Sequence, residues 1–234
     1  MVPRIYMHEY ISIIGANRAK YFEHMTSGWR QGAHERRHKT FGVWGTLGST
    51  GRWPQVVNLW EYEGGWEHLA ESFDHESSGA AMQDPFLRKW WLEAQPLRSG
   101  GYDRLLIPAD FSPSIDETIA RGIVGYRVFR HETVRTQPGQ ARRYLDRLGT
   151  HWAPRARELG MELIGAYRTA LRDDTEALLI WAIADWPTWG RAEQQVDDGA
   201  GRSWRDATRD IALAQDVHLM CSAPLSPLQT GAQP

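Results

Sequence analysis

Two parts of this chain are diverged copies of one another, and this repeat constrains the fold more than any other feature. The shift between matched residues is 123 in the first part of the repeat, 121 further on and 114 near its end. It changes only where loops are expected, and loops tolerate insertions. The matched pairs are His8/His131, Glu9/Glu132, Tyr21/Tyr144, Trp29/Trp152, Trp60/Trp181, Trp90/Trp204 and Leu105/Leu219. A collinear series of this kind indicates a tandem duplication.

Each copy has the hydrophobic pattern of a βαββαβ unit. The first copy predicts strands over about 4–12, 41–47, 55–62 and 102–107, a helix over 16–37 and shorter helices near 65–73 and 84–95. The second copy predicts strands over 123–132, 162–171, 176–183 and 216–222, and a helix over 138–159. We therefore divide the chain into a first half, 1–110, a linker, 111–121, a second half, 122–224, and a flexible tail, 225–234.

A four-stranded antiparallel sheet with helices on one face leaves its other face bare, and that face must be buried. Two copies in one chain bury both faces at once by packing them together. The predicted fold class is therefore α+β, with two ferredoxin-like units packed sheet to sheet as an intrachain α/β barrel.

Composition excludes several classes of partner. The formal net charge is −2, which gives no electrostatic reason to expect nucleic acid. No apolar run approaches the roughly 20 residues that span a bilayer, and the first residues do not resemble a signal peptide. The single cysteine, Cys221, cannot form an internal disulfide, so we expect a cytoplasmic protein, monomeric or homodimeric.

Three segments of the first copy resemble the NIPSNAP proteins. They are the opening YMHEYISIIGANRAKYFE, the strand and helix VVNLWEYEGGWEHL, and the closing LRSGGYDRLLIP. The resemblance implies the dimeric α/β-barrel superfamily, which includes small monooxygenases, cyclases, isomerases and haem proteins. It implies no defined reaction, and the family supplies no catalytic residue set. Fold resemblance is in any case a poor guide to chemistry.

The strongest candidates for chemistry are the equivalent histidines His8 and His131. Strand alternation puts Tyr6 and Tyr10 on the same face as His8. A histidine can take up and return a proton near neutral pH, so we assign His8 as general acid–base and the two tyrosines as hydrogen-bond donors. The alternative is a core histidine bonded across the sheet. Glu9 and Glu132 are expected on the opposite, helix-side face.

Further residues are predicted to line a substrate pocket beside His8. They are Trp44, Asn58, Trp60, Tyr62, Arg104 and His131. Arg104 has the geometry to bind a carboxylate, and the tryptophans would form a flat aromatic wall. Core packing and a sheet-face salt bridge are the alternatives, and the recurrence of Trp29 and Trp60 in both copies favours a structural role.

The two pockets are expected to be unequal. The second copy replaces Tyr6, Tyr10, Asn58 and Tyr62 by Phe129, Thr133, Leu179 and Ile183, so the first copy is predicted to hold the working site.

No bound metal or cofactor is predicted. His34 and His38 have the i, i+4 spacing of a metal pair, but they lie in a basic run. The predicted function is cofactor-independent acid–base chemistry on a small, largely apolar substrate: cyclisation, isomerisation, dehydration or oxygenation. The alternatives are a haem enzyme with His8 or His131 as axial ligand, and a non-catalytic ligand-binding protein.

Overall fold

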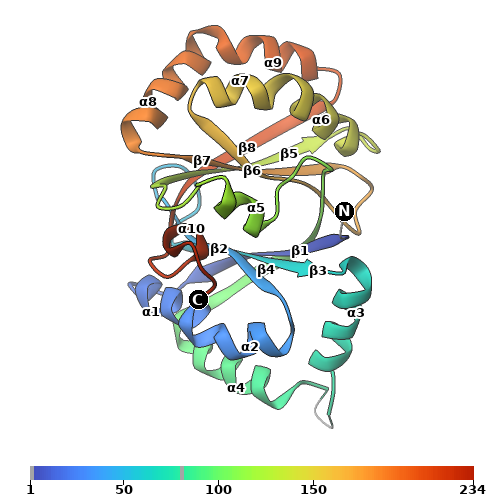
Figure 1. The fold of residues 1–234 in the computed structure, drawn as a ribbon, viewed down its shortest axis with the longest axis vertical. Coiled ribbons are helices and arrows are strands. Elements are labelled where there is room, and N and C mark those ends of the chain that lie inside the picture. The colour runs from blue at the N-terminus through green and yellow to red at the C-terminus, as the bar shows by residue number, and fades with distance from the viewer. Residues whose placement is uncertain (1–2, 80–81) are drawn as a thin grey trace.

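The computed structural model describes residues 3–79 and 82–234 of the chain. The strands close into one barrel in the order β1-β3-β2-β8-β5-β7-β6-β4. Figure 1 shows the two sheets face to face, with α1–α4 covering the outside of one and α6–α9 the outside of the other. The predicted α+β class and the packing of two ferredoxin-like units into one barrel are confirmed.

The first half contains β1 (Arg4–Ile13), α1 (Arg18–Met25), α2 (Arg30–Glu35), β2 (Lys39–Thr46), β3 (Gln55–Glu63), α3 (Gly65–Glu76), α4 (Pro85–Ala94) and β4 (Arg98–Pro108). The second half contains β5 (Val128–Thr136), α6 (Ala141–Arg147), α7 (Ala153–Glu158), β6 (Met161–Thr169), β7 (Glu176–Ile183), α8 (Trp186–Gln195), α9 (Gly201–Thr208) and β8 (Ala212–Ser222). The helix expected over 16–37 is thus divided, with a 3-10 turn at Ser27–Trp29 between α1 and α2.

Helix starts follow from local chemistry. Asp84 precedes α4 and its carboxylate accepts the backbone N–H of Leu87 at 2.7 Å, while Pro85 opens the first turn. Asp185 caps α8 in the same way, through the N–H of Thr188 at 2.8 Å. These contacts satisfy backbone donors that the first turn of a helix leaves without partners.

The two sheets join along two short seams. β2 pairs with β8 through Trp44, Gly45 and Thr46, and β4 pairs with β6 through Leu106, Ile107 and Pro108. The rest of β4 and β8 pairs on one side only, with β1 and β5 respectively. One half is therefore joined to the other by few backbone hydrogen bonds, and the buried side chains between the sheets hold them together.

The linker and the tail each contain a short helix. The linker contains α5 (Ile115–Ala120), which begins with a capping box formed by Ser114 and Glu117. The tail contains α10 (Pro227–Thr230), whose Leu228 is buried in the cluster between the sheets. The tail, predicted to be flexible, is thus packed against the core through the buried side chain of Leu228.

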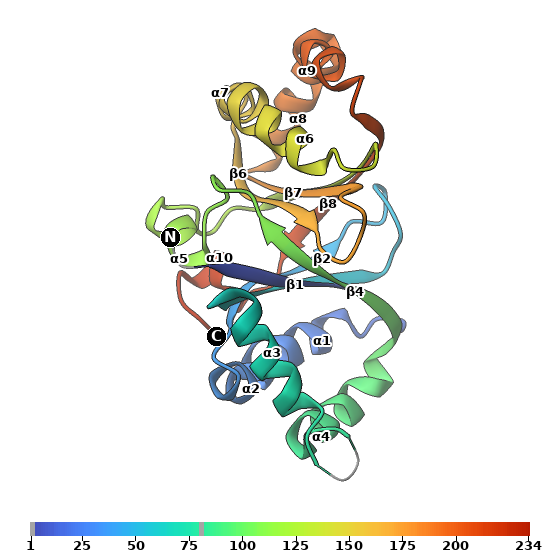
Figure 2. The same ribbon diagram turned by 90° about the vertical axis from the view of Figure 1, so that its right-hand side faces the viewer.

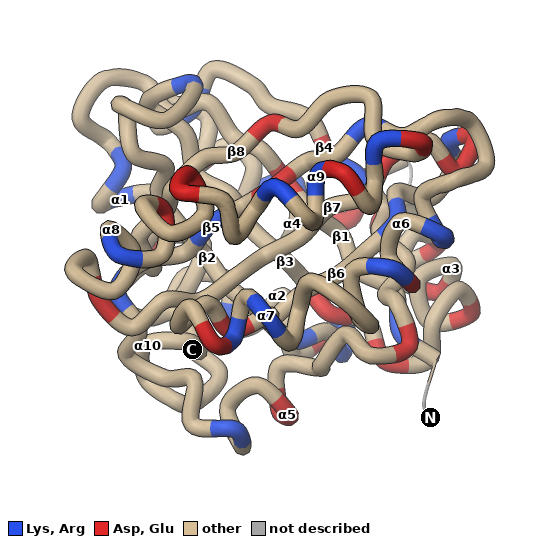
Figure 3. The backbone as a smooth tube through the Cα atoms, turned by 90° about the horizontal axis from the view of Figure 1, so that it is seen from above, with Lys and Arg blue, Asp and Glu red and all other residues tan. Residues whose placement is uncertain are grey.

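Figure 3 shows basic and acidic residues interspersed along the chain. Within residues 3–79 and 82–234, none of the helices combines the length and apolarity needed to cross a membrane.

Candidate functional site

Strand β1 presents one row of side chains to the barrel interior and the other to the helices. Tyr6 and Tyr10 belong to the core between the sheets, and His8 is fully buried between them, as the alternation predicted. Glu9 lies on the opposite face, also as predicted, and is only 7% exposed. The polar residues of β1 therefore form two separate sites.

The interior site brings the two repeated histidines together. His8 Nε2 and His131 Nε2 are 2.9 Å apart, and Tyr10 Oη is 3.1 Å from His131 Nδ1. Tyr10 also contacts His218 Nε2. Equivalent residues of two copies meet in this way at the axis of an isologous contact. The hydrogen bond between His8 and His131 requires one ring to donate and the other to accept, so it can form between two neutral rings.

Burial lowers the pKa of His8 and of His131 well below the ordinary value, and the neighbouring positive charge of Arg104 acts in the same direction. Both rings are completely buried. The cross-sheet core histidine that the sequence left as an alternative is therefore what the structure contains. Catalysis by His8, Tyr10 and Tyr6 stays a prediction from the sequence.

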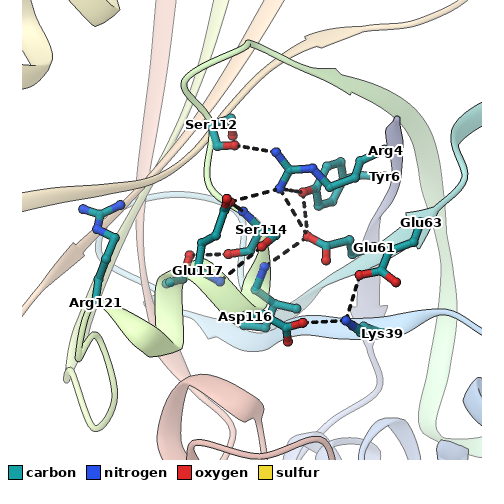
Figure 4. A network of polar contacts seen from close by, with 12 residues as sticks. Arg4, Tyr6, Lys39, Glu61, Glu63, Ser112, Ser114, Asp116, Glu117 and Arg121 are labelled. Carbon is teal, nitrogen blue, oxygen red and sulfur yellow. Dashed lines mark hydrogen bonds and ion pairs between the residues drawn. The ribbon is translucent and has the colours of Figure 1, made fainter. Parts of the chain in front are cut away.

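Tyr6 lies in a different polar network from Tyr10. Its hydroxyl donates to Glu61 Oε2 at 2.6 Å, and the same oxygen accepts the backbone N–H of Ile115 at 3.1 Å. Arg4 donates to the Tyr6 hydroxyl at 3.2 Å and to the backbone oxygen of Ser112 at 2.9 Å. Figure 4 shows this network joining β1 and β3 to the linker. Tyr6 thus fastens the linker to the barrel.

The predicted pocket wall beside His8 is partly wrong, because β3 has the opposite phase. His8 pairs with Leu59, whereas Asn58 pairs with Glu9. Residues opposite one another on neighbouring strands point to the same side, so Asn58, Trp60 and Tyr62 face the helices together with Glu9. A register difference of one residue exchanges the faces of a whole strand. β3 is buried on both sides, so its apolar pattern gave no indication of phase.

Three other predicted wall residues do face the interior. Trp44 packs against Phe129 with ring centroids 5.7 Å apart. Arg104 pairs with His8 across the sheet, lies over the ring of Tyr10 at 5.8 Å, and is 3.4 Å from Glu176. His131 bonds to His8, as described above.

A cavity of about 400 Å³ lies between the first sheet and its helices. Its wall is strongly aromatic, and its polar residues include three carboxylic acids and three arginines. It is lined by Met7, Glu9, Met25, Trp29, Arg36, His38, Trp60, Tyr62, Phe73, Glu76, Leu87, Trp90, Trp91, Asp103, Arg104, Leu105, Thr169, Ala170, Leu171 and Arg172. This size and lining are typical of sites for small organic molecules.

Glu9 is the best-placed titratable group in this cavity. Its Oε2 accepts the indole N–H of Trp60 at 2.8 Å and the amide of Asn58 at 2.9 Å. Burial raises the pKa of Glu9 to about 7, and the nearby Asp103 acts in the same direction. The two hydrogen bonds oppose this rise but do not cancel it. At neutral pH Glu9 is therefore present in both protonation states, as a general acid–base must be.

The histidine that lines the cavity has a structural role. His38 Nε2 accepts the indole N–H of Trp29 at 2.8 Å, and burial lowers the pKa of His38 to about 3. In the described ranges, no group of three or more His, Cys, Asp or Glu side chains is arranged to hold a metal ion. His34 and His38 therefore belong to no such group.

Comparison with known proteins shows the fold. No family model matches the chain, and no curated protein matches it. Among solved structures, a monooxygenase-like protein of Fusobacterium nucleatum subsp. nucleatum ATCC 25586 has a TM-score of 0.61 and 6% identity, covering 95% of this chain and 93% of that one. An anthrone oxidase-like protein has a TM-score of 0.60 and 10% identity, covering 94% and 91%.

NIPSNAP proteins are also among the structural neighbours. A NIPSNAP-like domain protein of Burkholderia xenovorans is 18% identical and covers 49% of this chain and 92% of that one, with a TM-score of 0.37. The fold that the NIPSNAP resemblance implied is the fold observed.

Proposed function

We propose that the cavity of the first half binds a small, largely apolar molecule and that Glu9 acts there as general acid–base. One observation carries this proposal: a buried carboxyl group with a pKa of about 7 lies on the wall of an aromatic cavity. Perturbed pKa values of this kind are a feature of functional sites.

The chemistry that suits this site is proton transfer at an activated carbon acid. The Glu9 carboxylate removes a proton from a carbon next to a carbonyl, and the carbon–hydrogen electron pair becomes the enolate. Protonated Glu9 then returns the proton to the same or another atom, so the step is balanced without a further reagent. Asn58 and Trp60 hold the carboxyl group in place through Oε2. Cyclisation, isomerisation and oxygenation can all begin with this step.

Trp29, Trp60, Trp90 and Trp91 make the cavity suitable for a flat aromatic ligand. Trp29 and Trp90 lie with ring centroids 4.7 Å apart, and Trp90 and Trp91 lie 5.2 Å apart. Aromatic ligands pack well against such rings in offset or edge-to-face arrangements. The likeness to an anthrone oxidase-like fold makes anthrone, a three-ring ketone with an acidic methylene group, a rational first probe.

The test is exchange of the anthrone methylene protons in deuterated buffer, followed by NMR. Wild-type protein should accelerate exchange, with a rate that rises through an apparent pKa near 7. The isosteric substitution Glu9→Gln should reduce the acceleration by about 10²–10⁴-fold. Glu132→Gln, at the equivalent position of the second half, is the matched control and should leave exchange unchanged.

Two results would contradict the proposal. One is an acceleration that Glu9→Gln retains in full. The other is an equal loss in the two variants, which would place the chemistry elsewhere or in both halves. Binding of anthrone without any exchange would favour the alternative of a non-catalytic ligand-binding protein.

The haem alternative does not fit the described residues. His8 and His131 bond to each other inside the barrel, away from the cavity. His38 lines the cavity, but its Nε2 is occupied by the Trp29 indole. In each of these three histidines Nε2 is therefore already hydrogen-bonded, and none is placed to be an axial ligand in the cavity.

A further inference from the structure

The loops between the second and third strands of the two halves cross the seams in equivalent ways. Leu47, just after β2, donates its N–H to the backbone oxygen of Leu219 at 2.9 Å. Ala170, just after β6, donates its N–H to the backbone oxygen of Leu105 at 2.8 Å. These are matched pairs of the repeat, because Leu47 corresponds to Ala170 and Leu219 to Leu105. Each half thus sends a loop to the last strand of the other, and Figure 2 shows the β2–β3 loop rising beside β8.

The two loops differ in the side chain that they bring to this position. Leu47 packs against the buried cluster of the second half. Ala170 has only a methyl group, and it lines the cavity of the first half. Leu47 therefore fills space in the helix-side layer of the second half. Ala170, being smaller, leaves space open in the helix-side layer of the first half.

The next residue of the second loop, Leu171, lies at the cavity mouth with its side chain outward. It is 86% exposed, and its φ of +57° is a left-handed conformation that side chains with a Cβ rarely adopt. The equivalent residue of the first half is Gly48. A ligand that extends out of the cavity would bury this exposed leucine side chain and gain an apolar contact from it.

The base of this loop is nevertheless well anchored. Thr169 Oγ1 donates to Glu176 Oε1 at 2.7 Å across the hairpin. The backbone oxygens of Asp173 and Asp174 accept N–H groups of Gly139 and Ala141, each at 3.0 Å. The loop is therefore held in place on both sides, and the position of residues 170 and 171 at the mouth is fixed by the second half.

We propose that Ala170 and Leu171, supplied by the second half, determine the specificity of the first-half cavity. Ala170 leaves the mouth wide enough for a fused-ring ligand, and the outer end of that ligand packs over the exposed Leu171. The inference rests on the proposed ligand site and adds that the second half contributes part of it. The substrate class is then a planar aromatic molecule that fits a cavity of about 400 Å³ and reaches from Glu9 to Ala170, which both line its wall.

The test is calorimetric titration with two probes of different length, anthrone and the two-ring 2-naphthol. Ala170→Leu should weaken anthrone binding by at least about tenfold while changing 2-naphthol binding much less, because added methylene groups obstruct the longer ligand. Ala170→Val should give an intermediate effect. If Ala170→Leu folds poorly, the affinities of Ala170→Val for the two probes still test the role of side-chain size at this position.

Leu171→Gly should weaken anthrone binding by about threefold without lowering the melting temperature, because glycine accepts the left-handed conformation freely. Leu47→Ala truncates the equivalent position of the other loop, and Leu213→Ala truncates another exposed leucine. Both controls should leave anthrone affinity unchanged.

The outcomes separate this inference from the proposed function. If Ala170→Leu bound anthrone as tightly as wild type, or lost affinity equally for both probes, the specificity role of the loop would be overturned. The proposed ligand site would stand. A wild-type protein that binds neither probe would overturn the proposed ligand site and this inference with it.

Discussion

The helix-side layers of the two halves differ although they descend from the same unit. In the first half, Glu9 is bound by neutral donors and lines a cavity of about 400 Å³. In the second half, the equivalent Glu132 is 3.1 Å from Arg130 and accepts the Gln215 amide at 2.7 Å. The cavity between β8 and α9 is smaller, about 240 Å³, and neither Glu132 nor Trp181 lines it.

The cause of the difference can be traced to single positions of the repeat. Arg130 corresponds to Met7, and Gln215 corresponds to Gly101. The first half therefore lacks both of the side chains that bind the carboxyl group of the second. Leu179 replaces Asn58, and the indole N–H of the buried Trp181 has no partner in the described structure. One copy keeps its glutamate in an ion pair, and the other leaves its glutamate available to a ligand.

The largest effect is expected from breaking the ion pair of the second half. Arg130→Met gives Glu132 the neighbour that Glu9 has, but at a position that does not line the cavity of its layer. Removing one partner of a buried pair costs about 3–5 kcal/mol. Urea unfolding should show this loss, and the double variant Arg130→Met/Glu132→Gln should recover part of it. A single variant as stable as wild type would show that the pair does not distinguish the halves.

The pH dependence of stability should identify Glu9 specifically. Its pKa is raised from the ordinary 4.5 to about 7 in the folded protein, so the folded state binds the proton more tightly than the unfolded state. This contribution is fully present below pH 4.5 and is lost as pH rises through 7, a change of about 3 kcal/mol. The unfolding free energy of Glu9→Gln, relative to wild type, should therefore increase by that amount between pH 4.5 and pH 8.

The buried histidines act in the opposite direction, which makes the comparison with Glu9→Gln necessary. Because their folded pKa values are lowered, His8 and His131 contribute stability that is present above the ordinary pKa of about 6.5 and is lost as pH falls below it. A difference between wild type and Glu9→Gln that does not vary with pH would contradict the assigned pKa of Glu9.

A smaller effect is expected when the first site is given the ion pair of the second. Met7→Arg places a guanidinium group on the strand position equivalent to Arg130, where it can pair with Glu9. An adjacent positive charge lowers the pKa of a carboxyl group by about 1–3 pH units. The pH profile of anthrone exchange should move to lower pH by that amount. Met7→Leu is the control for side-chain size, and an identical shift in that variant would exclude a charge effect.

Much of the fold could be predicted because it depends on local periodicity and on the repeat. Alternation along β1 separated Tyr6, His8 and Tyr10 from Glu9, and the matched pairs located both copies of the unit. The candidate site was harder to predict. His8 is a titratable residue, as expected, but its Nε2 is hydrogen-bonded to its own repeat partner. The sequence placed Glu9 on the helix side but did not predict the cavity beside it or its raised pKa. Alternation along a strand shows which face a carboxyl group is on, but it does not show how deeply that group is buried.

The sequence by itself determined the duplicated βαββαβ unit, the two faces of β1 and the need to bury a bare sheet. Only the tertiary structure decided which faces of neighbouring strands coincide, because a shift of one residue in β3 moves Asn58 and Trp60 from one layer to the other. It also decided that residue 170 belongs to the cavity of the other half. That placement depends on how two sheets meet at their seams, and contacts between residues far apart in the chain are set by packing, which local periodicity does not encode.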